Sequence, residues 1–308
     1  MKTSNSQYRF VLVTRKTRLQ ELVERFNTWP QARFYLEHND ADAQDYLNEH
    51  DLYQQRLREA ERVLRALGRF QQLERSLLPN YQFTSSDIVV VIGQDGLVAN
   101  TLKYLQGQPV IAINPDPERW DGKLLPFVID ELRDVVTRTL TGKTGSKSIT
   151  FAEARTNDGQ VMRAVNDLFI GPKSHTSARY TLSWKGKRET QSSSGIIVST
   201  GFGSTGWFQS VLAGAMGVTR AQGHELSHGF DWEEKRLQFS VREPFPSRTT
   251  GVELVFGAIT RQAPLRLESQ MPENGVIFSD GIEADYLGFN SGAVVTVGVA
   301  EMQGQLVC

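Results

Sequence analysis

The spacing of apolar runs changes near residue 140, and this change constrains the fold more than any other feature. Before it, short apolar runs alternate with helical stretches, which is typical of a parallel sheet covered by helices. These runs are RFVLVT (9–14), ARFYL near Phe34, DIVVVIG (87–93) and PVIAIN (109–114). After it, β-like runs such as SITFAEAR, ARYTLSWKG, GIIVST, LQFSVREPF and AVVTVGVAE follow one another between turn residues, which indicates a β-rich domain.

The length of 308 residues suffices for two domains, and we predict the fold class α/β plus β. An N-terminal Rossmann-like domain with a parallel sheet is expected over residues 1–140. A β-rich, sandwich-like domain is expected over residues 141–308. The polar segment LTGKTGSKS at 140–148 is the expected join.

Composition excludes several classes of function. Lys and Arg number 34 against 35 Asp and Glu, so net charge gives no general attraction to nucleic acid or an anionic membrane. The start, MKTSNSQYRFVLV, lacks the apolar stretch of a secretory signal, and no run approaches the roughly 18 apolar residues that span a bilayer. Cys308 is the single cysteine, so no intrachain disulfide can form. We expect a cytoplasmic protein with neither nucleic-acid nor membrane partners.

A long polar stretch at 41–78 carries apolar residues at three- and four-residue steps. This spacing predicts an amphipathic helix, closed by Pro79. The apolar positions are Tyr53, Leu57, Ala60, Leu64 and Leu67. Two interpretations are open: packing on the domain's own sheet, which the shortness of the pattern favours, and a seam between subunits.

The string HELSH at 224–228 matches the zinc-peptidase pattern H-E-x-x-H, which needs a helix to bring both imidazoles to one face. Gly223 and Gly229 bracket the string and its flanks are polar. A polar loop is therefore favoured over a zinc site.

Two glycine motifs also suggest nucleotide loops. GKT at 142–144 ends like a P-loop, but Thr137 stands where that loop needs its first glycine, so a linker is favoured. GFGSTG at 201–206 matches the dinucleotide pattern G-x-G-x-x-G, but β runs follow it where a βαβ unit would be required. These glycines are still expected to let the backbone approach a ligand.

The loop VIGQDGLVAN at 91–100 joins an apolar run to a helical stretch through glycines. Loops at the carboxyl ends of parallel strands are where open α/β sheets bind ligands, and a following helix N-terminus attracts anions. Asp95 is unusual there, because an acid repels phosphates unless it binds a cation or accepts a proton. The alternative is that Asp95 caps the helix. The residues alone leave both interpretations open.

This loop and several later segments together resemble the NAD kinase family. Gly93-Gln94-Asp95-Gly96 is similar to the family's G-G-D-G loop, Asn166-Asp167 to its Asn-Glu pair, and TGFGSTGW at 200–207 to its Thr-Gly-Ser-Thr-Ala-Tyr loop. The segment from Val276 to Ala300 resembles the family's closing hairpins, which contain an Asp-Gly pair. NPDPERWDGKLLPF, FIGPKSHTSARYTLSW, the segment at 192–195 and FSVREPF resemble the mitochondrial-type branch in particular. The resemblance runs from about Asp87 to the end of the chain.

The resemblance implies a Rossmann-like domain, a β-rich domain and a site between them. It implies transfer of the terminal phosphate of ATP, with Mg²⁺, to the 2′-hydroxyl of the adenosine ribose of NAD, giving NADP. It also implies a homodimer. Asp95 would be the catalytic residue, as general base or through magnesium; no residue is assigned as a dedicated metal ligand. The residues implied to bind substrate are Gly93, Gly96, Lys123, Asn166, Asp167, Thr205, Gly206, Trp207 and Ser210.

The chain also departs from the family pattern. Gln94 replaces the second glycine of the loop, Leu97 replaces a threonine, and Ser194 stands where many members have an acid. One alternative is a related kinase for a lipid or sugar hydroxyl, since lipid kinases share a G-G-D-G-type loop. The other, motivated by Gln94 and Leu97, is a catalytically silent NAD-binding regulator. The sequence does not distinguish ATP from polyphosphate as the phosphate donor, or NAD from NADH as the acceptor.

Overall fold

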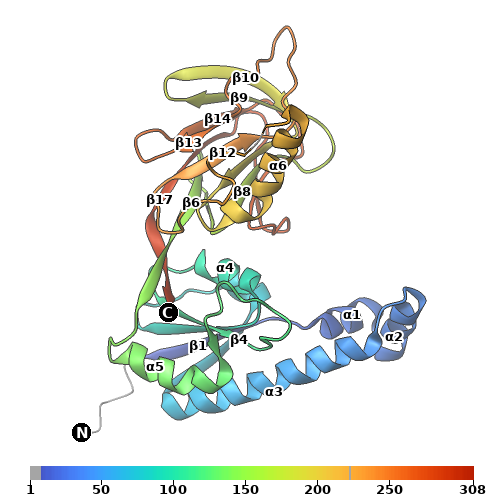
Figure 1. The fold of residues 1–308 in the computed structure, drawn as a ribbon, viewed down its shortest axis with the longest axis vertical. Coiled ribbons are helices and arrows are strands. Elements are labelled where there is room, and N and C mark those ends of the chain that lie inside the picture. The colour runs from blue at the N-terminus through green and yellow to red at the C-terminus, as the bar shows by residue number, and fades with distance from the viewer. Residues whose placement is uncertain (1–7, 222) are drawn as a thin grey trace. The chain divides into compact units, whose positions relative to one another are not determined.

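The computed structural model describes residues 8–221 and 223–308, which fold into two compact units (Figure 1). Of these described residues, unit 1 comprises those up to Lys147 together with Gln305–Cys308, and unit 2 comprises those from Ser148 to Gly304. The division of the chain thus falls after Lys147. The last four residues belong to unit 1, whereas the prediction of a single boundary at residue 140 assigned them to the second domain.

Unit 1 contains a parallel sheet in which β4, β3, β1 and β2 are successive neighbours. At the far side of β4 lie β5 and the end of β17, both parallel to it. The strands are β1 (Arg9–Thr14), β2 (Arg69–Glu74), β3 (Asp87–Ile92), β4 (Pro109–Asn114) and β5 (Phe127–Val128). The runs at 9–14, 87–93 and 109–114 are therefore confirmed as strands of a parallel sheet.

Helices α3 and α5 supply one apolar layer against this sheet. The helices of unit 1 are α1 (Arg18–Phe26), α2 (Trp29–His38), α3 (Ala43–Leu67), α4 (Asp95–Leu102) and α5 (Leu132–Leu140), with 3₁₀ helices η1 (Arg75–Asn80) and η2 (Ile129–Glu131). All five residues of the predicted apolar stripe on α3 belong to this core or pack against it. The stripe therefore faces the sheet of its own unit and does not form a subunit seam.

Two local predictions in unit 1 are wrong. The run ARFYL lies in helix α2, where Thr28 caps the N-terminus and Pro30 lies in the first turn. The helix expected over 41–78 ends at Leu67, with Gly68 as its C-cap, and the edge strand β2 follows directly. The apolar residues of RFQQLE, Phe70 and Leu73, are three residues apart, which fits helical periodicity and hid this strand.

Unit 2 is a two-sheet sandwich with a shared core. One sheet orders β10-β9-β14-β17, with β6 beside β17 and β7 beside β6; the other is antiparallel and orders β13-β12-β11-β8-β15-β16. The strands are β6 (Ser146–Thr156), β7 (Val161–Ala164), β8 (Asp167–Pro172), β9 (Ala178–Trp184), β10 (Lys187–Ser193), β11 (Ile196–Ser199), β12 (Leu237–Val241), β13 (Phe256–Ile259), β14 (Leu265–Ser269), β15 (Gly275–Ser279), β16 (Tyr286–Gly288) and β17 (Val294–Val307).

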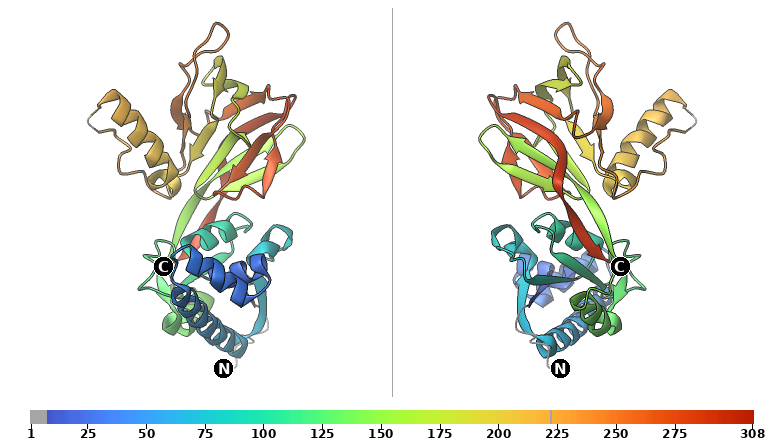
Figure 2. Two further views of the ribbon diagram at one scale, coloured as in Figure 1. Left: turned by 90° about the vertical axis from the view of Figure 1, so that its right-hand side faces the viewer. Right: turned by 90° about the vertical axis from the view of Figure 1, so that its left-hand side faces the viewer.

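Figure 2 shows this sandwich from two sides, together with helix α6 (Trp207–Thr219), which follows the short 3₁₀ helix η3 (Gly203–Thr205). The fold class predicted from the sequence, α/β plus β, is confirmed. Within residues 8–221 and 223–308, none of the helices combines the length and the apolar character needed to cross a membrane.

Candidate functional site

The loop between β3 and α4 brings the backbone close to its neighbours. Gly93 is buried, and its N–H donates to the carbonyl of Ile113 in the neighbouring strand at 3.3 Å. A Cβ atom added at Gly93 would lie 2.8 Å from Leu97 Cδ2, so the glycine allows the side chain of Leu97 to fill this space. Leu97 is only 2% exposed. Leu97 therefore adds to the core of unit 1.

Asp95 anchors a second loop to this one. Its carboxylate accepts hydrogen bonds from the backbone N–H groups of Lys123, at 3.2 Å, and Leu124, at 2.6 Å. The helix-cap interpretation is wrong, because Gln94 occupies the N-cap and Asp95 is the first residue of α4. Each carboxylate oxygen keeps a further lone pair, so Asp95 can still accept a proton.

The other predicted residues of unit 1 surround this anchor. Gly96 is exposed in the first turn of α4, and a Cβ atom there would meet nothing within 4 Å. Lys123 is exposed and belongs to the loop that Asp95 holds. A helix N-terminus with exposed N–H groups, next to a lysine, favours the binding of phosphate.

In unit 2, Asp280 organises the segment that carries Asn166 and Asp167. Its carboxylate accepts from the N–H of Asn166 at 2.7 Å, of Val165 at 3.1 Å and of Asp167 at 3.4 Å. Asp280 has a φ of 56° and Gly281 a φ of 72°, both left-handed. The Asp-Gly turn after β15 thus aims a carboxylate at three backbone donors.

Two side-chain oxygens of this segment are buried without a hydrogen-bond donor among the described residues: Oδ1 of Asn166 and Oδ1 of Asp167. Asp167 is 8% exposed. Burial raises the pKa of Asp167 to about 7; a hydrogen bond from Ser199 lowers that pKa, and the charge of Asp280 raises it. Buried acceptors without donors are rare in folded proteins, so these two oxygens suggest a place for ligand N–H or O–H groups.

The glycine loop at 201–206 is joined to the same segment. Thr200 donates its N–H to the carbonyl of Asn166 at 3.0 Å, and its hydroxyl accepts from the N–H of Gly203 at 3.1 Å. A Cβ atom at Gly203 would lie 2.1 Å from the Asn166 carbonyl oxygen. Gly203 is therefore required by close backbone approach to Asn166. Because β11 pairs antiparallel with both its neighbours, this loop is not a Rossmann turn.

Thr205 and Gly206 are exposed on this loop, directly before α6. Trp207 stacks on Phe169, with ring centroids 5.8 Å apart and planes 16° from parallel, and the Arg242 guanidinium lies 5.4 Å from the Trp207 ring. The half-buried Trp207 ring is thus held by a second aromatic ring. Ser210 is exposed, and its hydroxyl donates to the carbonyl of Trp207 at 2.7 Å.

The remaining motifs form no site of their own. Residues 225–228 form turns, so the helix that a zinc peptidase requires is not present in that string. Across the described chain, no group of three or more His, Cys, Asp or Glu side chains could hold a metal ion. The GKT string at 142–144 lies in the turn after α5, as expected of a linker.

The structure thus places Gly93, Gly96 and Lys123 next to Asp95, and the glycine loop that carries Thr205 and Gly206 against Asn166. Trp207 follows this loop and packs on Phe169, and Ser210 binds Trp207. Sequence reasoning missed Asp280 and Tyr53, whose hydroxyl binds the end of β3. The Asp-Gly dipeptide after an apolar run is a turn signal that marks Asp280. No sequence signal marked Tyr53 as a polar contact, because its position fits the apolar stripe of the predicted helix.

No protein-family model matches the chain. Over 121 residues the sequence is 28% identical to the NAD kinase of Saccharolobus solfataricus; the match covers 39% of this chain and 46% of that relative, less than half of its length. The structure is similar to that of yeast NADH kinase complexed with NADH, with a TM-score of 0.60, 14% identity, and coverage of 98% of this chain and 84% of that one. It is also similar to an NAD kinase from Archaeoglobus fulgidus in complex with ATP, with a TM-score of 0.58, 14% identity, and coverage of 97% and 93%. The chain therefore has the fold of these two kinases.

Proposed function

We propose that this protein is an NAD kinase, which transfers the terminal phosphate of ATP to the 2′-hydroxyl of the adenosine ribose of NAD and releases NADP. The observation that carries the proposal is the pair of buried oxygens of Asn166 and Asp167 beside the glycine loop of unit 2. The ribose and adenine of NAD supply the hydroxyl and amino donors that such oxygens lack. The likeness of fold to an NADH kinase and an NAD kinase supports the same substrate class.

In this proposal Asp95 is the general base that takes the proton of the 2′-hydroxyl as the phosphoryl group arrives. The amides of Lys123 and Leu124 hold its carboxylate in place, which limits the reorganisation needed during the reaction. The N-terminus of α4 and the Lys123 ammonium would stabilise the phosphate charge. A correctly placed base contributes about 10²–10⁴-fold in rate.

The residues fit a magnesium ion that arrives with the nucleotide. Mg²⁺ is commonly held by one or two carboxylates together with substrate phosphates, and Asp95 would supply one carboxylate if it acts through the ion and not as general base. When bound, the ion would neutralise charge on the phosphates.

The test is formation of NADP from NAD, or of NADPH from NADH, with ATP or polyphosphate as donor, read with an NADP-specific dehydrogenase. Wild-type protein should form NADP, and Asp95→Asn should lose about 10²-fold or more of the rate. A folded protein that binds NAD but forms no NADP with any donor would contradict the proposal and indicate a silent NAD-binding protein. A protein that NAD does not stabilise against heat would point to a lipid or sugar hydroxyl.

The mitochondrial-type branch is the finer assignment that the motifs at 114–127, 169–184, 192–195 and 239–245 favour. A homodimer is the assembly that the resemblance implies. Light scattering of the purified chain tests it, and the apolar stripe of α3 plays no part, because it is packed inside unit 1.

A further inference from the structure

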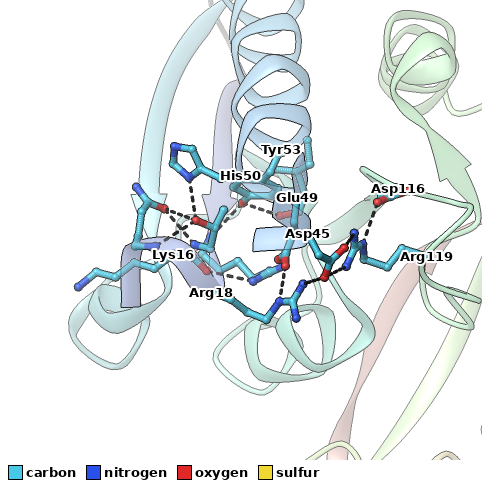
Figure 3. A network of polar contacts seen from close by, with 12 residues as sticks. Lys16, Arg18, Asp45, Glu49, His50, Tyr53, Asp116 and Arg119 are labelled. Carbon is cyan, nitrogen blue, oxygen red and sulfur yellow. Dashed lines mark hydrogen bonds and ion pairs between the residues drawn. The ribbon is translucent and has the colours of Figure 1, made fainter. Parts of the chain in front are cut away.

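Three polar residues of helix α3 lie one turn apart on one face: Asp45, Glu49 and Tyr53 (Figure 3). Each binds a loop or strand end at the carboxyl edge of the sheet in unit 1. None of the three belongs to the residues assigned above to substrate. Their contacts join the segments that follow β1, β3 and β4.

Tyr53 joins the ends of β1 and β3. Its hydroxyl accepts from the N–H of Arg15, just after β1, at 3.1 Å, and donates to the carbonyl of Ile92, the last residue of β3, at 3.0 Å. Burial raises the pKa of Tyr53 to about 12, so the hydroxyl keeps its proton and remains a donor at neutral pH. Ile92 directly precedes Gly93, so Tyr53 fixes the point at which the glycine loop begins.

Glu49 holds the segment that follows β1. Its side chain is only 4% exposed, and its carboxylate accepts from Arg15 at 2.9 Å and forms a second ion pair with Arg18. A buried carboxylate is tolerated only when it is paired and hydrogen-bonded. Glu49 therefore ties both arginines to α3.

Asp45 holds the loop after β4 through Arg119. One guanidinium nitrogen of Arg119 lies 3.0 Å from Asp45 Oδ2, a second nitrogen contacts Oδ1, and Arg18 binds the same carboxylate at 2.8 Å. The hydrogen bonds from Arg119 and then Arg18 lower the pKa of Asp45, so it is ionised at neutral pH. Arg119 also reaches Asp116 of its own loop at 3.3 Å.

The loop after β4 is therefore fixed at two points. Arg119 is bound by Asp45 of α3, and the amides of Lys123 and Leu124 are bound by Asp95 of α4. Movement of Arg119 would shift the two amides, four and five residues farther along, that hold the Asp95 carboxylate. Misplacement of a reacting group by about 1 Å can cost about 10²-fold in rate.

We infer that Asp45, Glu49 and Tyr53 form a positioning face on α3 that sets the geometry of the Asp95 loop for phosphoryl transfer. The inference rests on the proposed function for its effect on rate. The mechanical part, that α3 holds the loop whose amides bind Asp95, is measurable without any activity.

The experiment compares Asp45→Asn and Tyr53→Phe with Glu61→Gln, in the full chain. Glu61 forms an exposed i,i+4 ion pair with Arg65 at 2.7 Å on the same helix, so Glu61→Gln removes one charge from α3 without touching these loops. We expect kcat for NADP formation to fall about 10-fold or more in the first two variants, with KM for NAD unchanged within about twofold. Amide exchange at Lys123 and Leu124 should become faster in Asp45→Asn and stay unchanged in Glu61→Gln.

Unchanged kcat together with unchanged amide exchange in Asp45→Asn would overturn the inference. An equal loss in Glu61→Gln would also overturn it, because the effect would then be one of helix stability. If Tyr53→Phe fails to fold, Asp45→Asn decides, since that carboxylate is partly exposed. A wild-type chain that forms no NADP refutes the proposed function alone, and amide exchange still decides whether α3 holds the loop.

Discussion

The Oδ1 atom of Asp95 lies 2.6 Å from the backbone nitrogen of Leu124, so the proposed base also fastens two loops of unit 1 together. Its second oxygen receives the N–H of Lys123. A variant at this position therefore changes structure as well as chemistry. Activity alone does not separate the two effects.

We expect Asp95→Ala to lower the free energy of unfolding by about 1–3 kcal/mol, because two backbone donors lose their acceptor. Asp95→Asn should cost less, since one amide oxygen still accepts. Urea denaturation measures both. The control is Asp134→Ala, which removes an exposed carboxylate paired with Arg138 on α5 and should change stability by no more than about 0.5 kcal/mol. A cost at Asp95 equal to the cost at Asp134 would contradict the anchoring role.

Gly203→Ala should disturb the Asn166 segment. The new Cβ atom would lie 2.1 Å from the Asn166 carbonyl oxygen, and backbone must move to relieve this contact. We expect a loss of about 1–3 kcal/mol in denaturation and weaker binding of NAD. Gly214→Ala is the matched control, because it lies within α6 with nothing within 4 Å, and alanine there should stabilise the helix by up to about 1 kcal/mol.

Asp167→Asn should stabilise the fold in a pH-dependent way. Burial raises the pKa of Asp167 to about 7, so the folded protein binds a proton that the unfolded chain releases above about pH 4. Stability therefore falls as pH rises from about 4 to 7, by on the order of 4 kcal/mol for a shift of this size. Asparagine removes this penalty. Urea denaturation of both proteins at pH 8 and pH 5 checks this prediction. Asp167→Asn should raise the free energy of unfolding more at pH 8 than at pH 5, and equal increases at both pH values would contradict the raised pKa of Asp167.

Trp207→Ala should weaken the binding of NAD about tenfold, since a stacked aromatic contact is worth about 0.5–1.5 kcal/mol beyond the area it buries. Trp207→Phe keeps a ring next to Phe169 and should lose less. Isothermal titration calorimetry with NAD measures both affinities. If the Trp207→Ala and Trp207→Phe variants bind NAD as tightly as the wild-type protein does, Trp207 does not contact the dinucleotide.

The sequence alone determined the elements with strong local signals. Strands β1, β3 and β4 are continuous apolar runs because both faces of the sheet in unit 1 are buried, so their sequences predict them directly. Strands β2 and β10 were missed, because RFQQLE and KRETQSS carry few apolar residues and pair at sheet edges. An edge strand is held mainly by backbone hydrogen bonds to one neighbouring strand, so it does not need the apolar side chains that make a buried strand predictable from sequence.

The candidate site residues also divide into those that the sequence indicates and those that only the tertiary structure brings together. The glycine loops and Asp95 stand out as local patterns, because a turn or a helix start requires particular residues at fixed spacing, whereas the Asn166-Asp167 pair was singled out only by its resemblance to the NAD kinase family. Asp280 binds the backbone of Asn166 from 114 residues away, and Arg119 reaches Asp45 across 74. Such hydrogen bonds depend on which strands pair and where each helix packs, and only the tertiary structure decides that.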